Sequence, residues 1–294
     1  MDENVCIWNV TTGKLGNILK NNGRRINELF RINEKTILTL DYPERTIRIW
    51  DIDSRRCIWE KGDTSYEIAF SPESPLYAEQ TIEKELFVKD VIKHNVLWTR
   101  QMKEHVKRII WSYDRKQILT RLHSDYLLLI NAESGDIIET FSEKYSWGRF
   151  SPDGKYLVCT GKGIFGIWDC EKRRMIKEYT SNQEHFINIL FSEDCKYLII
   201  CGWRSVDCFI SMDIGNDEII IPEETHIHMR YTSGIEEDFL FAVDNDGIFR
   251  VWDYSTGKIR KKIRLSEGEI AGVEWGEQKQ IVAILYKDKT LLIL

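Results

Sequence analysis

His226 and His228, which are separated by one residue, have the side-chain type and the spacing that could hold a metal ion. On a β-strand both imidazoles would point to one face, because successive side chains alternate between the two faces of a sheet. Glu223 or Glu224 could then complete the set of ligands. The alternative is a solvated entrance to a strand. We favour that alternative, so the sequence predicts no metal site.

Motifs of common catalytic sites are absent from the sequence. It contains no Gly-x-Ser-x-Gly nucleophile elbow, no Gly-x-x-x-x-Gly-Lys phosphate loop and no His-Glu-x-x-His zinc motif. Its acidic clusters, Glu236–Asp238 and Asp213–Glu218, are interpreted as solvated turns. We therefore expect no catalytic residues, no cofactor and no enzymatic activity.

A short apolar run closed by a Trp-Asp pair recurs along the chain and organises the elements around it. The strict and near copies end in Trp50-Asp51, Trp168-Asp169, Trp252-Asp253 and Trp8-Asn9. With weaker copies included, the anchor positions are 8, 50, 89, 130, 168, 212, 252 and about 293. A period of roughly 40 to 45 residues is typical of a four-stranded propeller blade.

In these motifs the chain resembles a WD-repeat β-propeller, and the resemblance covers nearly its whole length. It implies an all-β fold of seven four-stranded antiparallel blades, in a single domain over residues 1–294, which seven periods of about 42 residues fill. The Trp residues and the Asp residues beside them would be structural anchors, with Trp50, Trp168 and Trp252 buried at equivalent places. Function does not follow from the resemblance, because this fold is shared by many activities.

The two ends of the chain carry strands that lack a complete blade. Residues 270–294 supply three strands of a final blade, and residues 14–19 have the pattern of an outer strand. We expect residues 14–19 to pair with the strand at 290–294 and close the propeller, since open sheet edges promote aggregation. Residues 1–10 form an extra strand of uncertain placement. It caps an edge, displaces the C-terminal strand, or belongs to a longer array of blades.

The polar network usual in this family is only partly matched. The Gly-His pair expected before the first strand of each repeat is missing, and some repeats lack the anchor Trp. Pieces of the network remain as Trp252 with Asp246 and Trp50 with Asp41. We therefore expect the blades around residues 86–131 to be held more by apolar packing than by polar networks.

Composition limits the classes of partner. The net charge is −6, from 41 basic and 47 acidic residues, which argues against broad nucleic-acid binding. No apolar run approaches the roughly 18 residues of a membrane span, and the N-terminus lacks the layout of a signal peptide. Seven cysteines occur without a Cys-x-x-Cys pair. We interpret them as reduced thiols of a cytoplasmic protein, with zinc binding or disulfides as the alternative.

One face of the propeller is a candidate partner-binding surface. The family names the strands of a blade a to d, and its b–c turns and d–a loops share the top face, where peptides dock. By strand matching, this face would carry the candidate residues Trp203, Arg204, Tyr42, Arg45, Tyr126, Arg24 and Arg25. Trp, Tyr and Arg dominate binding hot spots. The alternative is that some of these side chains only fill their turns.

The outer strands carry a second candidate surface. Eight residues after the anchor Asp, two consecutive blades have Trp59 and Trp98, where the other blades are mostly polar. We expect both indoles to point outward and to form an apolar patch on the rim, because a repeated pair of exposed aromatics calls for an explanation. The alternative is that each ring lies flat on its own blade.

Two basic turns, Arg55-Arg56 and Lys172–Arg174, fall between strands c and d, on the face opposite the top. Phosphoinositide-binding propellers carry a Phe/Leu-Arg-Arg-Gly motif, and Gly23–Ile26 does not match it. We therefore assign no lipid-binding role.

The sequence favours a non-catalytic scaffold that binds a peptide or protein partner on the top face, with a second contact at the Trp59/Trp98 rim. One alternative is the propeller domain of a larger sensor or regulatory protein, associated with its other domains or subunits. The other is a propeller enzyme, which would need titratable side chains converging on one cavity.

Overall fold

The computed structural model of this chain describes residues 4–9, 14–20, 25–42, 46–62, 65–180, 186–192, 194–202, 209–216, 218–220, 223–224, 229–236, 239–244, 247–265, 270–276, 281–286 and 291–293. These residues form β-strands and turns, and none of them lies in a helix. Accordingly, the described part of the chain holds no helix that could cross a membrane. The chain divides into two compact units, Met1–Glu143 and Lys144–Leu294.

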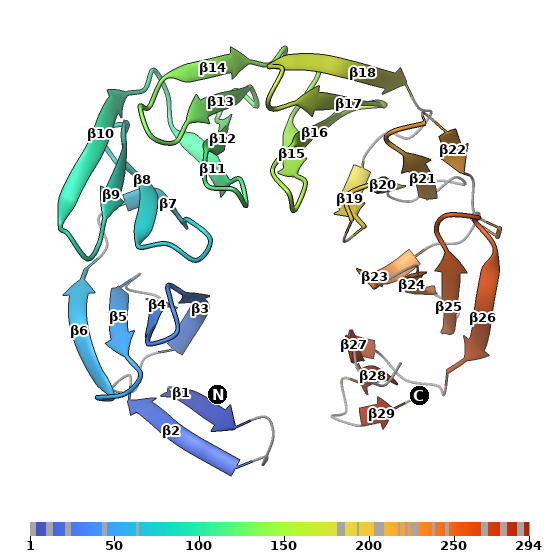
Figure 1. The fold of residues 1–294 in the computed structure, drawn as a ribbon, viewed down its shortest axis with the longest axis horizontal. Coiled ribbons are helices and arrows are strands. Elements are labelled where there is room, and N and C mark those ends of the chain that lie inside the picture. Colours follow the sequence, from blue (N-terminus) through green and yellow to red (C-terminus); the bar gives the residue numbers. More distant parts are fainter. Residues whose placement is uncertain are drawn as a thin grey trace. The chain divides into compact units, whose positions relative to one another are not determined.

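The first unit contains a two-stranded hairpin and three four-stranded antiparallel sheets, which we call blades 1 to 3 (Figure 1). The hairpin consists of β1 (Asn4–Asn9) and β2 (Lys14–Lys20). Blade 1 consists of β3 (Arg25–Arg31), β4 (Thr36–Tyr42), β5 (Ile47–Asp51) and β6 (Arg56–Lys61). Blade 2 consists of β7 (Ser65–Phe70), β8 (Leu76–Thr81), β9 (Glu85–Asp90) and β10 (Asn95–Gln101). Blade 3 consists of β11 (Val106–Trp111), β12 (Gln117–Leu122), β13 (Leu127–Asn131) and β14 (Ile137–Thr140).

The second unit contains three four-stranded sheets, blades 4 to 6, and a sheet with three described strands, blade 7. Blade 4 consists of β15 (Trp147–Phe150), β16 (Tyr156–Gly161), β17 (Ile164–Asp169) and β18 (Arg174–Thr180). Blade 5 consists of β19 (Phe186–Phe191), β20 (Tyr197–Gly202), β21 (Phe209–Asp213) and β22 (Glu218–Ile220), and blade 6 of β23 (Met229–Glu236), β24 (Phe239–Asp244), β25 (Ile248–Asp253) and β26 (Ile259–Arg264). The described strands of blade 7 are β27 (Ile270–Gly276), β28 (Ile281–Tyr286) and β29 (Leu291–Ile293).

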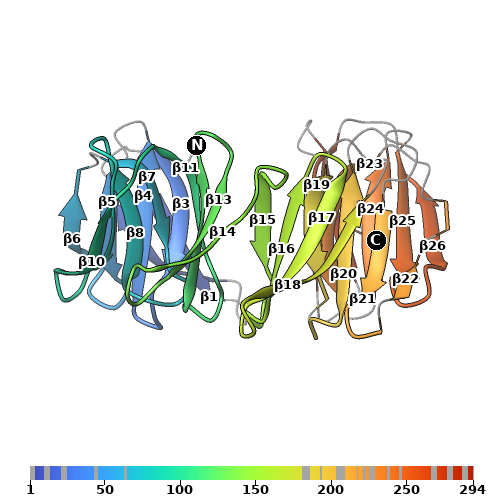
Figure 2. The same cartoon turned by 90° about the horizontal axis from the view of Figure 1, so that it is seen from above.

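Each blade is a meander, in which consecutive strands pair antiparallel and the order in the sheet follows the chain. Figure 2 shows β15 to β18 of blade 4 running side by side, as their pairing requires. In blade 1 the third strand, β5, is buried along nearly its whole length, whereas the outer strand, β6, is mostly exposed. A strand buried on both faces needs apolar residues throughout, which explains the short continuous apolar runs of the repeat.

The Asp after the anchor position closes the turn to the outer strand. Asp169 Oδ1 accepts hydrogen bonds from the backbone N–H groups two and three residues ahead, at 3.1 and 2.7 Å. Asp253 Oδ1 accepts the equivalent bonds, both at 3.0 Å. In other blades the side-chain oxygen of the equivalent residue also accepts backbone N–H groups of the following turn; these residues are Asp51, Asp90, Asn131 and Asp213. A short polar side chain that bonds its own backbone stabilises this turn locally, so Asp or Asn recurs here.

A β-bulge recurs beside the anchor position. In five blades the pairing between the third and fourth strands shifts by one residue at this point. The extra residues in the outer strands are Ile58, Leu97, Ile138, Ile176 and Arg260. A bulge bends its strand and increases the local twist, so it redirects the side chains around it.

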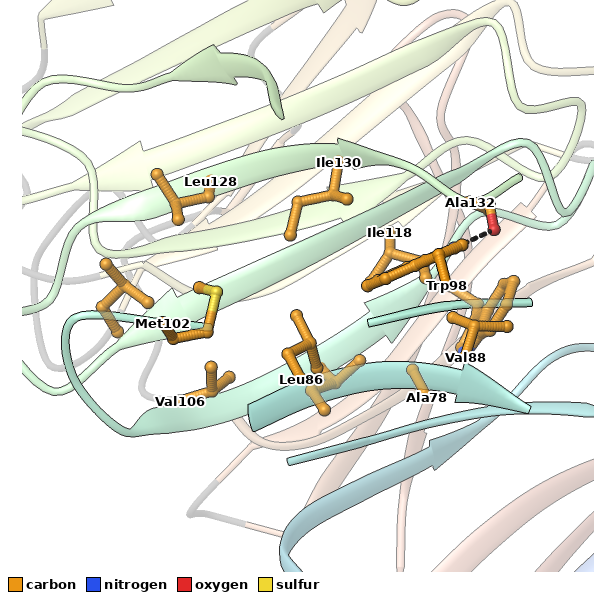
Figure 3. Close-up of a cluster of buried hydrophobic side chains, with 13 residues drawn as sticks. Ala78, Leu86, Val88, Trp98, Met102, Val106, Ile118, Leu128, Ile130 and Ala132 are labelled. Atoms are coloured by element: carbon orange, nitrogen blue, oxygen red, sulfur yellow. Dashed lines mark hydrogen bonds between the residues drawn. The ribbon is translucent and has the colours of Figure 1, made fainter. Parts of the chain in front are cut away.

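Apolar side chains of neighbouring blades pack between the sheets. The largest cluster joins blades 2 and 3, where Leu86 and Val88 of β9 pack in one core with Ile118 of β12 and Ile130 of β13 (Figure 3). In the second unit, blades 4 and 5 are joined in the same way through Phe165, Ile167, Leu198 and others. Burial of such side chains from both sheets supplies the main favourable free energy of this fold.

The N-terminal strands form a hairpin. Strand β2 pairs with β1, from Lys20 opposite Asn4 to Lys14 opposite Asn9. The two strands are adjacent in the chain, and their hairpin buries Val5 and Leu19 against Ile37 and Trp50 of blade 1. The pairing of residues 14–19 with the strand at 290–294, which would join the two units, stays a prediction.

Candidate functional site

Most of the predicted top-face residues lie outside the part of the chain that the structure describes. Trp203, Arg204, Arg45 and Arg24 lie outside the described residues, as do His226 and His228. Tyr42 and Arg25 are described in their backbone only, where they face each other across β4 and β3.

The top-face arrangement can be followed at blade 3. The loop before β11 and the turn after β12 meet there, since the His123 N–H donates to the His105 carbonyl (2.9 Å) and their rings lie 6.5 Å apart. Tyr126, in the same turn, is half-buried against the core cluster, and its hydroxyl lies 3.4 Å from Glu143 Oε2. This side chain packs in its turn, so only part of the ring is accessible to a partner.

Trp98 does not lie on the rim. It is only 9% exposed and belongs to the core between blades 2 and 3. Its indole N–H donates to the carbonyl of Ala132 in blade 3 (2.8 Å), a bond that Figure 3 shows. Gly135 lies against the ring so closely that a Cβ there would stand 2.6 Å from Trp98 Cδ2. The predicted outward position of Trp98 is therefore wrong.

The register of the outer strands explains this error. Trp98 lies opposite Val88, and Trp59 lies opposite Ile49 in the equivalent pair of blade 1. Residues directly opposite each other in an antiparallel pair project from the same face of the sheet. Val88 and Ile49 are buried between blades, so both indoles point toward the next blade rather than outward.

Apolar side chains are nevertheless exposed on these outer strands and in the β9–β10 turn. Exposure is 58% at Ile58, 51% at Ile92, 49% at Val96 and 38% at Leu97. Ile58 and Leu97 are the bulge residues next to the two indoles. Trp59 is half-buried, and its ring lies 6.2 Å from that of His94 in the β9–β10 turn. We call Ile58, Trp59, Ile92, His94, Val96 and Leu97 the rim patch.

The anchor Trp residues are structural. Trp50, Trp168 and Trp252 are buried at equivalent positions, whereas the side chain of Trp8 lies outside the described part. Trp50 Nε1 donates to Thr39 Oγ1 (2.8 Å), and Trp252 Nε1 donates to the Glu223 carbonyl (2.9 Å).

The predicted network around Asp41 takes another form. Its carboxylate accepts the Thr46 N–H (2.8 Å) and an Arg48 guanidinium N–H. Asp246, the predicted partner of Trp252, lies outside the described residues. The structure thus keeps a Trp–Thr bond in blade 1 and bonds Asp41 to a buried arginine.

The anchor Asp of blade 6 has a perturbed acidity. Burial of Asp253 opposes its ionisation, but hydrogen bonds from Ser255, Arg260 and the Thr256 N–H outweigh burial and lower the pKa of this carboxyl to about 2. The shift stabilises the turn at neutral pH.

A buried ion pair joins blades 1 and 2. Glu79 is 1% exposed, and Lys61 Nζ lies 2.8 and 2.6 Å from its two carboxylate oxygens. The ammonium also lies 5.7 Å from the centre of the Tyr77 ring. Burial, together with Glu79, raises the pKa of the Tyr77 phenol. The group is held between blades and serves their packing.

A pocket of about 550 Å³ lies in the first unit, between the β1–β2 hairpin and blade 1. Its charged lining consists of Lys20, Arg48, Arg55, Arg56 and Glu60, and the remaining lining of Ile18, Trp50 and Cys57. These residues come from β2, β5, β6 and the β5–β6 turn. The sequence predicts Arg55-Arg56 as a basic turn, but no motif predicts that Lys20 and Arg48 line the same pocket.

The cations of this pocket fall into two groups. Arg48 is almost fully buried, with Nε 2.9 Å from Glu60 Oε2 and Nη1 bonded to Asp41. Burial lowers the pKa of Arg48, but the bonds from both carboxylates outweigh this effect and raise it. Lys20, Arg55 and Arg56 are exposed, and no described residue forms an ion pair or a side-chain hydrogen bond with them.

No group of three or more potential metal ligands occurs within the described ranges. The described thiol of the pocket, Cys57, donates to the Trp59 carbonyl (3.1 Å), and burial raises its pKa. A protonated thiol is a poor nucleophile and a poor metal ligand.

Comparisons with known proteins support the fold. No protein-family model matches the chain, and no curated protein matches it. Among solved structures, the chain is similar to the computationally designed Ika8 protein, with 15% identity and a TM-score of 0.68 over 99% of this chain and 90% of that chain. It is also similar to the β-propeller domain of Cps50 (Swd1) from Myceliophteria thermophila, with 11% identity and a TM-score of 0.54 over 92% of this chain and 95% of that chain. Together with the seven antiparallel blades, these similarities confirm the all-β, seven-bladed β-propeller class predicted from the sequence.

Proposed function

We propose that this protein is a non-catalytic scaffold of the WD-repeat type that binds a peptide or protein partner. The propeller fold supports an interaction role in general, since it presents loops and outer strands on a rigid frame. The observation that carries the proposal is the rim patch, in which exposed apolar side chains lie on the outer strands of blades 1 and 2 and in the β9–β10 turn.

The chemistry of the rim patch suits a protein partner. Single exposed apolar residues are ordinary, but adjacent ones rimmed by polar groups mark interaction sites. Ile58 and Leu97 occupy the bulge position in consecutive blades, and the Trp59 ring of β6 contacts the His94 ring in the β9–β10 turn of the next blade. Half-buried Trp is a frequent binding hot spot, because it presents a large rigid surface with little loss of side-chain entropy.

The proposal keeps the top face as a second contact surface, through Trp203 and Arg204. It also includes a cytoplasmic location and no nucleic-acid partner. The free thiols of Cys6, Cys57 and Cys159 support a reducing compartment, and the net charge of −6 supports a partner other than nucleic acid.

A second candidate is the propeller domain of a larger regulatory protein, in which a neighbouring domain would cover the rim patch. The β1–β2 hairpin supports it, because the two strands pair with the same bulge as the third and fourth strands of the blades. Under this hypothesis the partner of the rim patch is part of the same polypeptide.

The experiment compares charge-introducing variants in co-purification from cell extract. Ile58→Glu with Leu97→Glu alters the rim patch, Ile137→Glu is a control at an exposed position on the outer strand of blade 3, and Ile82→Glu alters the b–c turn of blade 2 on the top face. All four changes are at exposed positions, so each should change the free energy of unfolding by less than about 0.5 kcal/mol. We expect one protein to co-purify with wild type and both controls but not with the rim variant. Once purified, this protein should bind the purified wild-type chain directly. Equal binding by all variants would exclude the rim patch, and loss only with Ile82→Glu would move the site to the top face.

A further inference from the structure

The pocket between the β1–β2 hairpin and blade 1 is a site distinct from the rim patch. We propose that it binds a small ligand carrying a phosphate monoester, held by Lys20, Arg55 and Arg56. Its volume of about 550 Å³ lies within the range of roughly 300 to 1,000 Å³ that is typical of small-molecule sites.

The charge of the lining indicates an anion. Four cationic side chains and one carboxylate line the pocket. Arg48 is already bonded to Glu60 and Asp41, so these three groups satisfy one another. The other cations, on β2, in the β5–β6 turn and at the start of β6, have no ionic partner among the described residues. Positive charges that converge on a cavity from two separate elements repel one another, and a bound anion relieves this repulsion.

The chemistry of the donors indicates a phosphate monoester. Arginine has a planar fork of N–H groups that matches phosphate oxygens, and lysine adds a point charge. A phosphate monoester carries about −1.5 to −2 charges at neutral pH. The excess positive charge left once Arg48 is neutralised by its two carboxylates is of similar size. Ile18 and Trp50 provide an apolar wall, which suits an organic group attached to the phosphate.

The backbone at Arg55 allows its side chain to be removed without strain. Arg55 has φ of 61°, in the left-handed region. The equivalent positions of blades 3 and 6 are Gly135 and Gly257, at φ of 76° and 72°. A residue with a Cβ is strained there, whereas glycine is not. Arg173 of blade 4 shares the strained position, at φ of 51°, and therefore provides a matched control.

The test uses the full chain and two double variants with the same change of charge. Arg55→Gly with Arg56→Gln removes two cations from the pocket, and Arg173→Gly with Arg174→Gln removes the equivalent exposed pair from the β17–β18 turn. Glycine suits both turn positions, so melting should be unchanged or slightly raised in both. Lys20→Gln removes a cation on the other side of the pocket.

Binding is measured by calorimetry with phenyl phosphate, inorganic phosphate and benzenesulfonate, and by sedimentation with phosphatidylcholine vesicles with and without phosphatidic acid. We expect phenyl phosphate to bind more tightly than the singly charged benzenesulfonate. The pocket double variant and Lys20→Gln should each weaken binding, the double variant by at least about tenfold, while the blade 4 control should not. Binding only in solution identifies a soluble ligand, and binding only to phosphatidic acid vesicles identifies a lipid headgroup; both support the site.

A second readout follows the Cys57 thiol, which lines the pocket, against Cys6, which is exposed outside it. Phenyl phosphate should slow alkylation of Cys57 and leave that of Cys6 unchanged. The proposal is overturned if wild type binds none of the phosphate probes, if the two double variants lose binding equally, or if the ligand leaves Cys57 alkylation unaffected.

Discussion

Replacing Trp98 by alanine tests the finding that this indole is a structural element between blades 2 and 3. A buried tryptophan removes roughly 200 Å² from water, which at about 25 cal/mol per Å² is worth close to 5 kcal/mol. Measured losses for such truncations are about 3 to 5 kcal/mol. The change also leaves the Ala132 carbonyl without its 2.8 Å bond from the indole N–H, which adds about 1 kcal/mol. The total loss is then about 4 to 6 kcal/mol, and at roughly 2 °C per kcal/mol Trp98→Ala should melt about 8 to 12 °C below wild type.

Two further variants make this prediction specific. Trp59→Ala removes the same side chain from the same strand position in blade 1, but this ring is less deeply buried than Trp98, so the loss should be smaller, about 2 to 3 kcal/mol. Gly135→Ala should destabilise wild type, because its Cβ would stand 2.6 Å from the Trp98 ring at a φ of 76°. In the Trp98→Ala background the clash disappears and the added loss should fall by about 0.5 to 3 kcal/mol. Calorimetry and urea unfolding are applied to wild type, the three single variants and the Trp98→Ala/Gly135→Ala double variant. Equal melting of the two Trp variants, or full additivity with Gly135→Ala, would refute the packing described.

Three other perturbations have defined outcomes. The ionised Asp253 carboxylate contributes stability that is complete above its unfolded pKa of about 3.8 and is lost as pH falls through its folded pKa of about 2. In a calorimetric pH series, Asp253→Asn should therefore melt lower than wild type at neutral pH and should lose less stability than wild type between about pH 4 and pH 2; equal losses would contradict this assignment. Lys61→Met leaves the carboxylate of Glu79 buried without its cation and should cost about 3 to 5 kcal/mol in denaturant unfolding, whereas adding Glu79→Met should recover most of it; no recovery would mean that the pair is not the cause. Deleting residues 1–20 uncovers the apolar face of blade 1, so melting should fall and a hydrophobic dye should bind; unchanged melting would show that the hairpin is not part of this core.

The blade pattern could be predicted from the sequence because its determinants are local. A Trp-Asp pair at the end of an apolar run combines a large buried side chain with a carboxylate that bonds its own turn, as Asp169 does. Both features depend on neighbouring residues, so they recur at a fixed period whatever the rest of the chain does.

The rim and the pocket depend on information that is not local. Trp98 was expected outside because outer strands face solvent along their edge, but side-chain direction depends on the bulge at Leu97 and on which face the next blade covers. The hairpin of β1 with β2 was not predicted because a sequence period does not say which strands pair outside the complete blades. The basic pocket brings Lys20 next to Arg55, 35 positions apart in sequence, through packing that no motif reports.

The most direct measurement for the scaffold proposal is photo-cross-linking from the rim patch. A photoreactive amino acid replaces Ile58 in one protein and Ile137 in a second, and both are irradiated in cell extract. The cross-linked protein is then identified by mass spectrometry and purified for a binding titration. The proposal predicts a discrete adduct from position 58 only, with a partner whose affinity for the unmodified protein falls at least about tenfold in Ile58→Glu with Leu97→Glu. The same adducts from both positions, or a partner that binds this variant as tightly as wild type, would contradict it.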